Sequence, residues 1–280
     1  MFMECVVNVS EGRDERVLGQ LSVAAQPVLL DVHRDPDHHR SVFTLAGADD
    51  EVDRAVRALA TECVARLDLG AHHGAHPRAG VLDVVPFVPY RPGGPPESDP
   101  SATAPHRDDF ARWLGTVLGV PSFLYGPLTG GQRRTLPQLR GHAFREIPPD
   151  FGPHQPHRTA GATMVGARSA LVAYNVWVSS VAVARRVAPL VRGPAVRALG
   201  LAVGARAQVS CNLVEPFTFG PAHLYDLVAA RVEEAGGSVL GAELVGLLPE
   251  PILRAIPSAR WTELGLSPEQ TVEARLTGKP

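Results

Sequence analysis

The sequence is poor in cysteine and has no long apolar run. Its three cysteines, Cys5, Cys63 and Cys211, lie far apart and form no CxxC pair, which argues against a disulfide framework and against a structural zinc site. No apolar stretch approaches the roughly 20 residues that a membrane-spanning helix needs, and the first apolar run is too short for a secretion signal. These absences favour a cytoplasmic protein without a membrane partner.

The chain also lacks an excess of charge of either sign. The formal net charge is −2, and arginine greatly outnumbers lysine, although the arginines are scattered and form no basic tail. Bulk electrostatics therefore argues against nucleic acid as a partner. The 45% hydrophobic and 20% charged residues are typical of a globular protein, and 280 residues suffice for one large domain or two of ordinary size.

Hydrophobic periodicity predicts an α+β protein with two halves, residues 1–170 and 171–280. In the first half the order is strand, helix, strand, strand, helix, strand, which is the split β-α-β or ferredoxin-like unit. The expected segments are residues 4–10, 13–26, 27–33, 40–47, 48–69 and 80–90. A helix at 107–119 and a strand at 121–126 extend this half, and residues 127–158 are expected to be irregular.

The same order returns in the second half. The expected segments are residues 170–178, 179–192, 195–203, 207–213, 221–236 and 238–249. Pro189 makes the end of the first of these helices uncertain. We therefore expect two ferredoxin-like subdomains.

The stretch "AHHGAHPRAG" places His72, His73 and His76 within five residues. His72 and His76 are spaced like the ligands of an HExxH zinc site, but Gly74 and Pro77 interrupt the helix, and the glutamate base is absent. A solvated polar loop is the second interpretation. The third is a proton carrier, because histidine titrates near neutral pH, and Arg78 could bind a carboxylate in a bidentate manner.

A second polar cluster, "DVHRDPDHHRSV", contains His33, Asp35, Asp37, His38, His39 and Arg40. It connects the second and third expected strands, and the first cluster connects the second helix to the fourth strand. We expect these two connections at opposite ends of the sheet, although the second cluster is long enough to fold back. The sequence leaves open whether the clusters meet.

Several stretches together resemble the glutamate formiminotransferase family, in order and near-spacing over almost the whole chain. They are "ECVVNVSEGRD", "LLDVHRDPDHHRSVFTLAG", "GAHPRAGVLDVVPFVP", "VPSFLYG", "RRTLPQLR", "DFGP" with "GATMVGAR", "QVSCNL" and "LVGLLP". The resemblance implies two α/β subdomains with a substrate groove between them. It also implies transfer of the formimino group from N-formiminoglutamate to N5 of tetrahydrofolate, a step of histidine degradation and one-carbon metabolism.

The resemblance further implies roles for individual residues. His76, in "HPR", corresponds to the acid/base of the family and is the expected catalytic residue. The expected folate-binding segment is Gly152, Pro153, His154, Gln155, Pro156, His157, Arg158, Thr159, Ala160 and Gly161. The expected substrate-binding residues are Asp35, Asp37, His39, Arg40 and Arg78. No metal and no tightly bound cofactor is expected, and tetrahydrofolate is the co-substrate.

This chain departs from the family pattern at several positions. Ala71, His73 and Ala75 stand where lysines and a glutamate are common, His39 replaces a usual asparagine, and His33 falls where animal members have an acid. These changes leave open a relative that uses 5-formyltetrahydrofolate or another formimino or formyl donor, and a folate-binding protein without turnover. We expect no cyclodeaminase module after Pro280. The partners expected are small molecules, and a homodimer is an open option.

Overall fold

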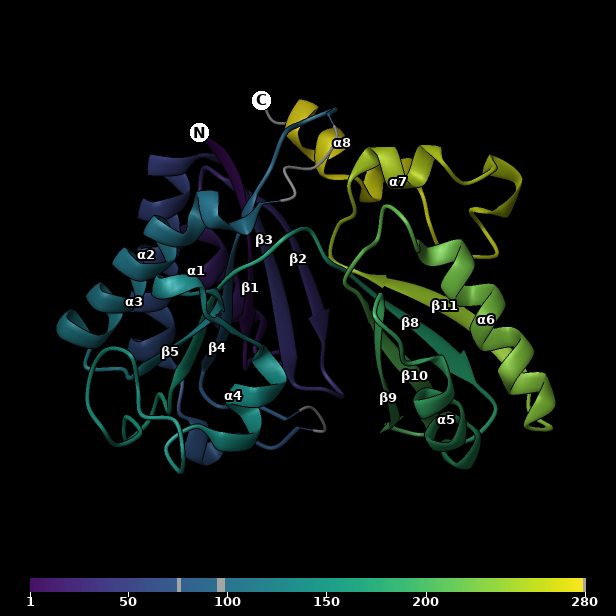
Figure 1. Ribbon diagram of the computed structural model, residues 1–280, viewed down its shortest axis with the longest axis horizontal. Helices are drawn as coiled ribbons and strands as arrows, with labels where there is room; N and C mark the ends of the chain where they lie inside the picture. The colour runs from purple at the N-terminus through teal and green to yellow at the C-terminus, as the bar shows by residue number, and fades with distance from the viewer. Residues whose placement is uncertain (75–76, 95–98, 279–280) are drawn as a thin grey trace. The chain divides into compact units, whose positions relative to one another are not determined.

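The computed structural model describes residues 1–74, 77–94 and 99–278 and divides into two compact units (Figure 1). Unit 1 comprises Met1–Arg91 and Pro96–Ser169, and unit 2 comprises Pro92–Pro95 and Ala170–Pro280. Both units combine helices with a sheet, so the predicted α+β class is confirmed.

Unit 1 is built around a seven-stranded mixed sheet within its described residues. The strands are β1 (Phe2–Val9), β2 (Leu29–Asp35), β3 (Arg40–Ala48), β4 (Leu82–Pro89), β5 (Ser122–Pro127), β6 (Arg133–Arg134) and β7 (Thr163–Ala167). The helices are α1 (Glu15–Ala24), α2 (Asp49–Arg66), α3 (Ala104–Val117) and α4 (Leu136–His142).

The first four strands of unit 1 form the predicted ferredoxin-like unit. Their spatial order is β2-β3-β1-β4, and β1 runs antiparallel to both β3 and β4. Beyond β4 the sheet continues with β7 and β5, each parallel to its neighbour, and ends in the short antiparallel β6. As a result β4 has a strand on both sides.

Burial alternates along β1, as expected for a strand with one face in a core. Met3, Cys5, Val7 and Val9 are fully buried in the main core of unit 1, where α1, α2 and α3 pack. α1 begins after Asp14, whose carboxylate accepts the N–H of Arg16 and Val17, and three acidic residues at the start of α2 favour its dipole. A second, smaller core lies under α4 and contains Leu139.

Unit 2 contains the second ferredoxin-like arrangement in an antiparallel four-stranded sheet, as far as its residues are described. The strands, in the order β11-β8-β10-β9, are β8 (Val172–Val178), β9 (Val196–Val203), β10 (Arg206–Leu213) and β11 (Val239–Val245). The helices are α5 (Val181–Val187), α6 (Pro221–Glu234), α7 (Glu250–Arg254) and α8 (Val272–Thr277). α5 and α6 close the core of this unit.

Three local predictions need correction. Residues 127–158 are not irregular throughout, because they contain β6 and α4, which begins with a capping box of Thr135 and Gln138. The stretch "GATMVGAR", to which we assigned no element, contains β7. α5 ends at Val187, and a 3-10 turn, Ala188–Val191, takes up Pro189.

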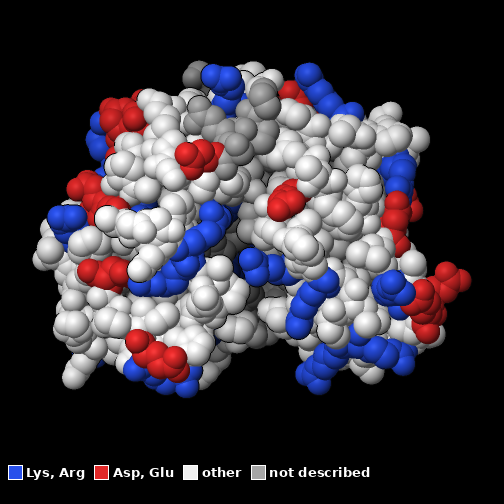
Figure 2. All heavy atoms as spheres, in the orientation of Figure 1, with Lys and Arg blue, Asp and Glu red and all other residues white. Residues whose placement is uncertain are grey.

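The surface carries charges of both signs. Figure 2 shows the basic and acidic side chains in small groups, with much uncharged surface around them. Among the helices of the described residues, none combines the length and the apolarity that crossing a membrane requires.

Candidate active site

The two histidine-containing clusters lie at the same end of the unit 1 sheet. Val9, at the end of β1, pairs with Ser41 near the start of β3 and with Leu82 at the start of β4. Because β3 and β4 both run antiparallel to β1, both begin beside its last residue. The prediction that the two connections lie at opposite ends was therefore wrong.

His39 and His72 bring the two clusters into contact. Their rings stack with centroids 4.1 Å apart, and Nε2 of His72 donates to the carbonyl oxygen of His39 at 2.8 Å. Nδ1 of His72 then faces the guanidinium of Arg78 as an acceptor. Gly74 permits the two clusters to lie this close, because a Cβ at position 74 would be 2.3 Å from the carbonyl oxygen of His38.

Both stacked histidines favour the neutral state. Burial lowers the pKa of His72, and the Arg78 guanidinium adds to this effect, although the bond to the His39 carbonyl opposes it. Burial also lowers the pKa of His39, and the neighbouring His72 acts in the same direction. A neutral His72 is the form that can accept from Arg78.

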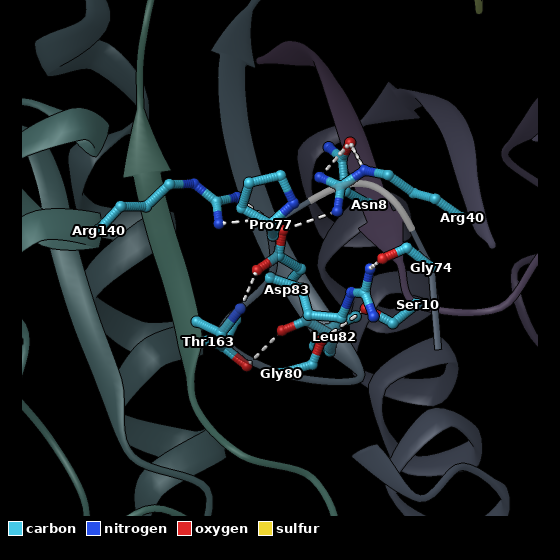
Figure 3. Close-up of polar contacts among 12 residues, drawn as sticks. Asn8, Ser10, Arg40, Gly74, Pro77, Gly80, Leu82, Asp83, Arg140 and Thr163 are labelled. Atoms are coloured by element: carbon cyan, nitrogen blue, oxygen red, sulfur yellow. Dashed lines mark hydrogen bonds and ion pairs between the residues drawn. The ribbon is translucent and has the colours of Figure 1, made fainter. Parts of the chain in front are cut away.

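Asp83 is the charged centre of the site (Figure 3). It is the extra residue of a β-bulge, because Val9 pairs with Leu82 while Asn8 pairs with Val84, and a bulge re-aims its side chain. The fully buried carboxylate accepts from Arg40 and Arg140 at 2.7 Å each and from the backbone N–H of Ala79 at 2.7 Å. Burial raises the pKa of Asp83, but the two guanidinium groups outweigh it, and the pKa falls to about 2.

Arg40 and Arg140 reach Asp83 from different elements. Arg40, at the start of β3, also donates from Nε and Nη2 to the side-chain oxygen of Asn8, at 3.2 and 2.9 Å. Arg140, in α4, also donates from Nη1 to the carbonyl oxygen of Pro77 at 3.2 Å. The Asp83 carboxylate thereby connects β4 with β3 and α4, and it also binds the segment that follows His76.

Glu11 organises the connection between β1 and α1. Its buried carboxylate accepts the backbone N–H groups of Gly12, Arg13 and Asp14 through one oxygen, at 2.8, 2.6 and 3.0 Å. The N–H of Gly12 also donates to Nδ1 of His39 at 3.1 Å. This turn is therefore tied to the second histidine cluster.

The expected folate-binding segment, residues 152–161, ends beside the first cluster. The N–H of Val81 donates to the carbonyl of Ala160, and the N–H of Leu69 donates to that of Thr159, at 3.0 and 2.7 Å. His154, Gln155 and Arg158 are exposed. His157 has a local structural role, because its Nδ1 accepts the N–H of Ala160 at 3.0 Å.

The other expected site residues lie in different settings. Asp35 closes the β2–β3 turn, since its carboxylate accepts the N–H groups of Asp37 and His38 at 2.8 Å each, and Asp37 is exposed. His76, the expected catalytic residue, lies outside the described residues. Across the ranges 1–74, 77–94 and 99–278, no three His, Cys, Asp or Glu side chains group as metal ligands.

Sequence reasoning missed Asp83, Arg140, Asn8 and Glu11. Asp83 had a visible signal: it is the only charged residue in the apolar strand "GVLDVVPFVPY", and a charge in such a strand requires a partner. Arg140 ends "RRTLPQLR", one of the stretches that resemble the family, but its pairing had no signal, since its partner lies 57 residues away in sequence.

Comparisons with known proteins show the family to which the sequence is similar. Residues 2–168 match the family model described as the formiminotransferase domain, N-terminal subdomain. The chain is 32% identical over 275 residues to a glutamate formimidoyltransferase of Streptococcus pyogenes serotype M1, covering 90% of each chain. It is 30% identical over 277 residues to the glutamate formimidoyltransferase of Thermoplasma acidophilum, covering 90% of this chain and 89% of that protein.

A longer relative matches in part. The formimidoyltransferase-cyclodeaminase of Sus scrofa is 35% identical over 277 residues, which cover 89% of this chain and 50% of that protein. The chain therefore spans half the length of the pig protein.

Proposed function

The chain belongs to the formiminotransferase family, and on that premise we propose that it is an enzyme that transfers the formimino group of N-formiminoglutamate to N5 of tetrahydrofolate. The products are 5-formiminotetrahydrofolate and glutamate. The observation that carries this proposal is the match, along nine-tenths of both chains, to a protein named for this transfer. The charged residues around the segment that follows His76 provide the groups to which we assign substrate binding.

The reaction requires one proton to move between two nitrogens. N5 of tetrahydrofolate attacks the amidine carbon and loses its proton, and the bond from that carbon to the glutamate nitrogen then breaks as this nitrogen gains a proton. We assign both transfers to His76 as general base and then general acid, because an imidazole can accept and return a proton near neutral pH. The transfer as written needs no further cofactor.

We assign Arg78 to a carboxylate of the donor. Its guanidinium is oriented by His72 and by the carbonyl of Gly74, to which Nη2 donates at 2.7 Å. Arg40 is less suited to this role, because it is committed to Asn8 and Asp83. We therefore give Arg40 a supporting role.

The donor amidine is cationic and calls for an acidic neighbour. Asp37 is exposed, whereas one carboxylate oxygen of Asp35 is occupied by the turn that it closes. Of the two aspartates, Asp37 is the better ligand. We give His39 a supporting role, because its ring stacks on that of His72.

We assign residues 152–161 to folate. The exposed His154, Gln155 and Arg158 can bind the anionic glutamyl end of tetrahydrofolate. The assignment is supported by the hydrogen bond from the N–H of Val81 to the carbonyl of Ala160. This bond holds the segment beside the residues that follow His76.

The direct test is an assay of the purified protein with tetrahydrofolate and N-formiminoglutamate, with product identified by absorbance and mass. We expect 5-formiminotetrahydrofolate and glutamate in equal amounts. A reaction with 5-formyltetrahydrofolate instead, or folate binding without turnover, would contradict the proposal. The cytoplasmic location remains a prediction, to be tested by cell fractionation, and a homodimer remains an open option, to be tested by light scattering.

A further inference from the structure

The residues on both sides of the pair 75–76 are held by arginines. The carbonyl of Gly74 accepts from Arg78 at 2.7 Å, and the carbonyl of Pro77 accepts from Arg140 at 3.2 Å. Arg78 belongs to the same segment, so its bond is local. Arg140 comes from α4 and is a long-range attachment at Pro77, whereas Ala79 and Val81 are also held by backbone bonds with Ala162 and Ala160.

Asp83 attaches the same segment at two points. One carboxylate oxygen accepts the backbone N–H of Ala79 directly, and the other holds Arg140 at 2.7 Å. Figure 3 shows Asp83 between the two guanidinium groups, with Arg140 next to Pro77. Residues one and three positions after His76 are therefore both fixed by a single buried carboxylate.

The position of Arg140 is fixed by the helix α4, which is capped and packed. The helix begins with a capping box between Thr135 and Gln138, and Leu139, the neighbour of Arg140, is fully buried in the core under α4. An arginine is required in this geometry because its planar fork can donate to two acceptors in different directions. Arg140 does so, with Nη2 on Asp83 and Nη1 on Pro77.

We propose that Arg140 is a positioning residue for the transfer reaction: held by Asp83, it fixes the backbone of Pro77, which follows the assigned acid/base in sequence. This inference rests on the proposed function. Arg140 acts without contact with substrate, so its loss affects turnover more than affinity.

The kinetic test compares Arg140→Ala, Arg140→Lys and the control Arg57→Ala. Arg57 is matched to Arg140 because its side chain is 23% exposed against 24% and it also pairs with an aspartate of another element. We expect Arg140→Ala to lower kcat by about 10–100-fold while KM for both substrates stays within about threefold, because a small misplacement of a reacting group is costly. Arg57→Ala keeps the kcat of the wild type.

Rescue separates positioning from general damage. Added guanidinium should restore part of the kcat of Arg140→Ala and leave the wild type unchanged, and Arg140→Lys should be intermediate, since an ammonium keeps the charge but loses the fork. The inference is overturned if Arg140→Ala turns over like the wild type, or if its loss is matched by Arg57→Ala and is not restored by guanidinium.

Hydrogen exchange tests the same inference by a measurement that does not depend on enzyme activity. Peptides that cover Arg78 to Val81 should lose protection in Arg140→Ala and keep it in Arg57→Ala. If the wild type shows no formimino transfer, the proposed function fails. The exchange measurement then decides the anchoring alone: lost protection supports it, and unchanged protection overturns it.

Discussion

The two units share a strand order but differ at the equivalent end of the sheet. By register, Val9, Ser41 and Leu82 of unit 1 correspond to Val178, Ala207 and Val239 of unit 2. Both sheets have a bulge at the start of the fourth strand of the ferredoxin-like unit. The residue left out of the pairing is Asp83 in unit 1 and Leu240 in unit 2.

The environment of these two bulge residues is opposite. Asp83 is fully buried, and Leu240 is 64% exposed. The cause is the next strand: β4 is covered by β7, whereas β11 is an edge strand of its sheet. The difference teaches that the strands added beyond β4 in unit 1 bury a bulge residue that is exposed at the sheet edge in unit 2.

The arginines that begin the third strands differ in the same way. Arg40 donates to Asn8 and Asp83, whereas the equivalent Arg206 lies over the ring of Trp177, 3.9 Å from its centroid. Ten of the eleven histidines also fall in unit 1. The histidines and the paired Asp83 are therefore concentrated in one of two similar frameworks.

Exchanging the bulge residues tests this contrast most strongly. Asp83→Leu leaves the partly buried guanidinium groups of Arg40 and Arg140 without their carboxylate and should lower the free energy of unfolding of unit 1 by about 3–5 kcal/mol. Leu240→Asp, at an exposed edge, should stay within about 0.5 kcal/mol of the wild type. Calorimetry with hydrogen exchange to assign the melting unit measures both, and equal effects of the two changes would remove the contrast.

Removal of a histidine from each unit tests where catalysis lies. His76→Ala should lower kcat by on the order of 10² or more, because general acid–base catalysis is lost, with folate affinity nearly intact. His223→Ala, the matched change in unit 2, should leave kcat unchanged. Steady-state kinetics and a folate titration decide the matter, and a normal kcat for His76→Ala would exclude the assigned role.

Acid should affect unit 1 before unit 2. The folded pKa of Asp83 is depressed to about 2, so its contribution to stability is present above about pH 4 and is lost as pH falls towards 2. This contribution is about 2 kcal/mol. Among the described residues of unit 2, no carboxylate is buried. Denaturant titrations between these pH values should show the loss in the wild type and a shallower pH dependence in Asp83→Leu; identical slopes would contradict the prediction.

Arg78→Ala is the smallest of the expected effects. It should raise KM for the formimino donor by about tenfold with little change in kcat, because a charge-assisted hydrogen bond to a carboxylate is lost. Arg192→Ala in unit 2, where Nε donates to the backbone carbonyl of Ala198 at 2.9 Å, is the control. A normal KM for Arg78→Ala would leave the carboxylate to another residue.

Much of the fold could be predicted because its signals are local. The apolar alternation of β1 and the acidic start of α2 fix these elements, and the same element order in both halves predicts two ferredoxin-like units. β7 gave no such signal, because its place between β4 and β5 follows from parallel pairing with strands distant in sequence.

The candidate site was predicted less completely. The composition of the histidine clusters marked His39, His72 and Arg78 for attention, but their meeting depends on the direction of β3 and β4 relative to β1. The pairing of Asp83 with Arg140 depends on α4, a short helix in a stretch expected to be irregular. Long-range pairing, rather than residue type, was the missing information.

Glu11 has a consequence for the design of inhibitors. The first amides after β1 would otherwise form a receptor for phosphate or a carboxylate, but the chain supplies its own anion there. An acidic group added to a substrate analogue gains no affinity from this turn, and useful contacts must come from guanidinium groups instead.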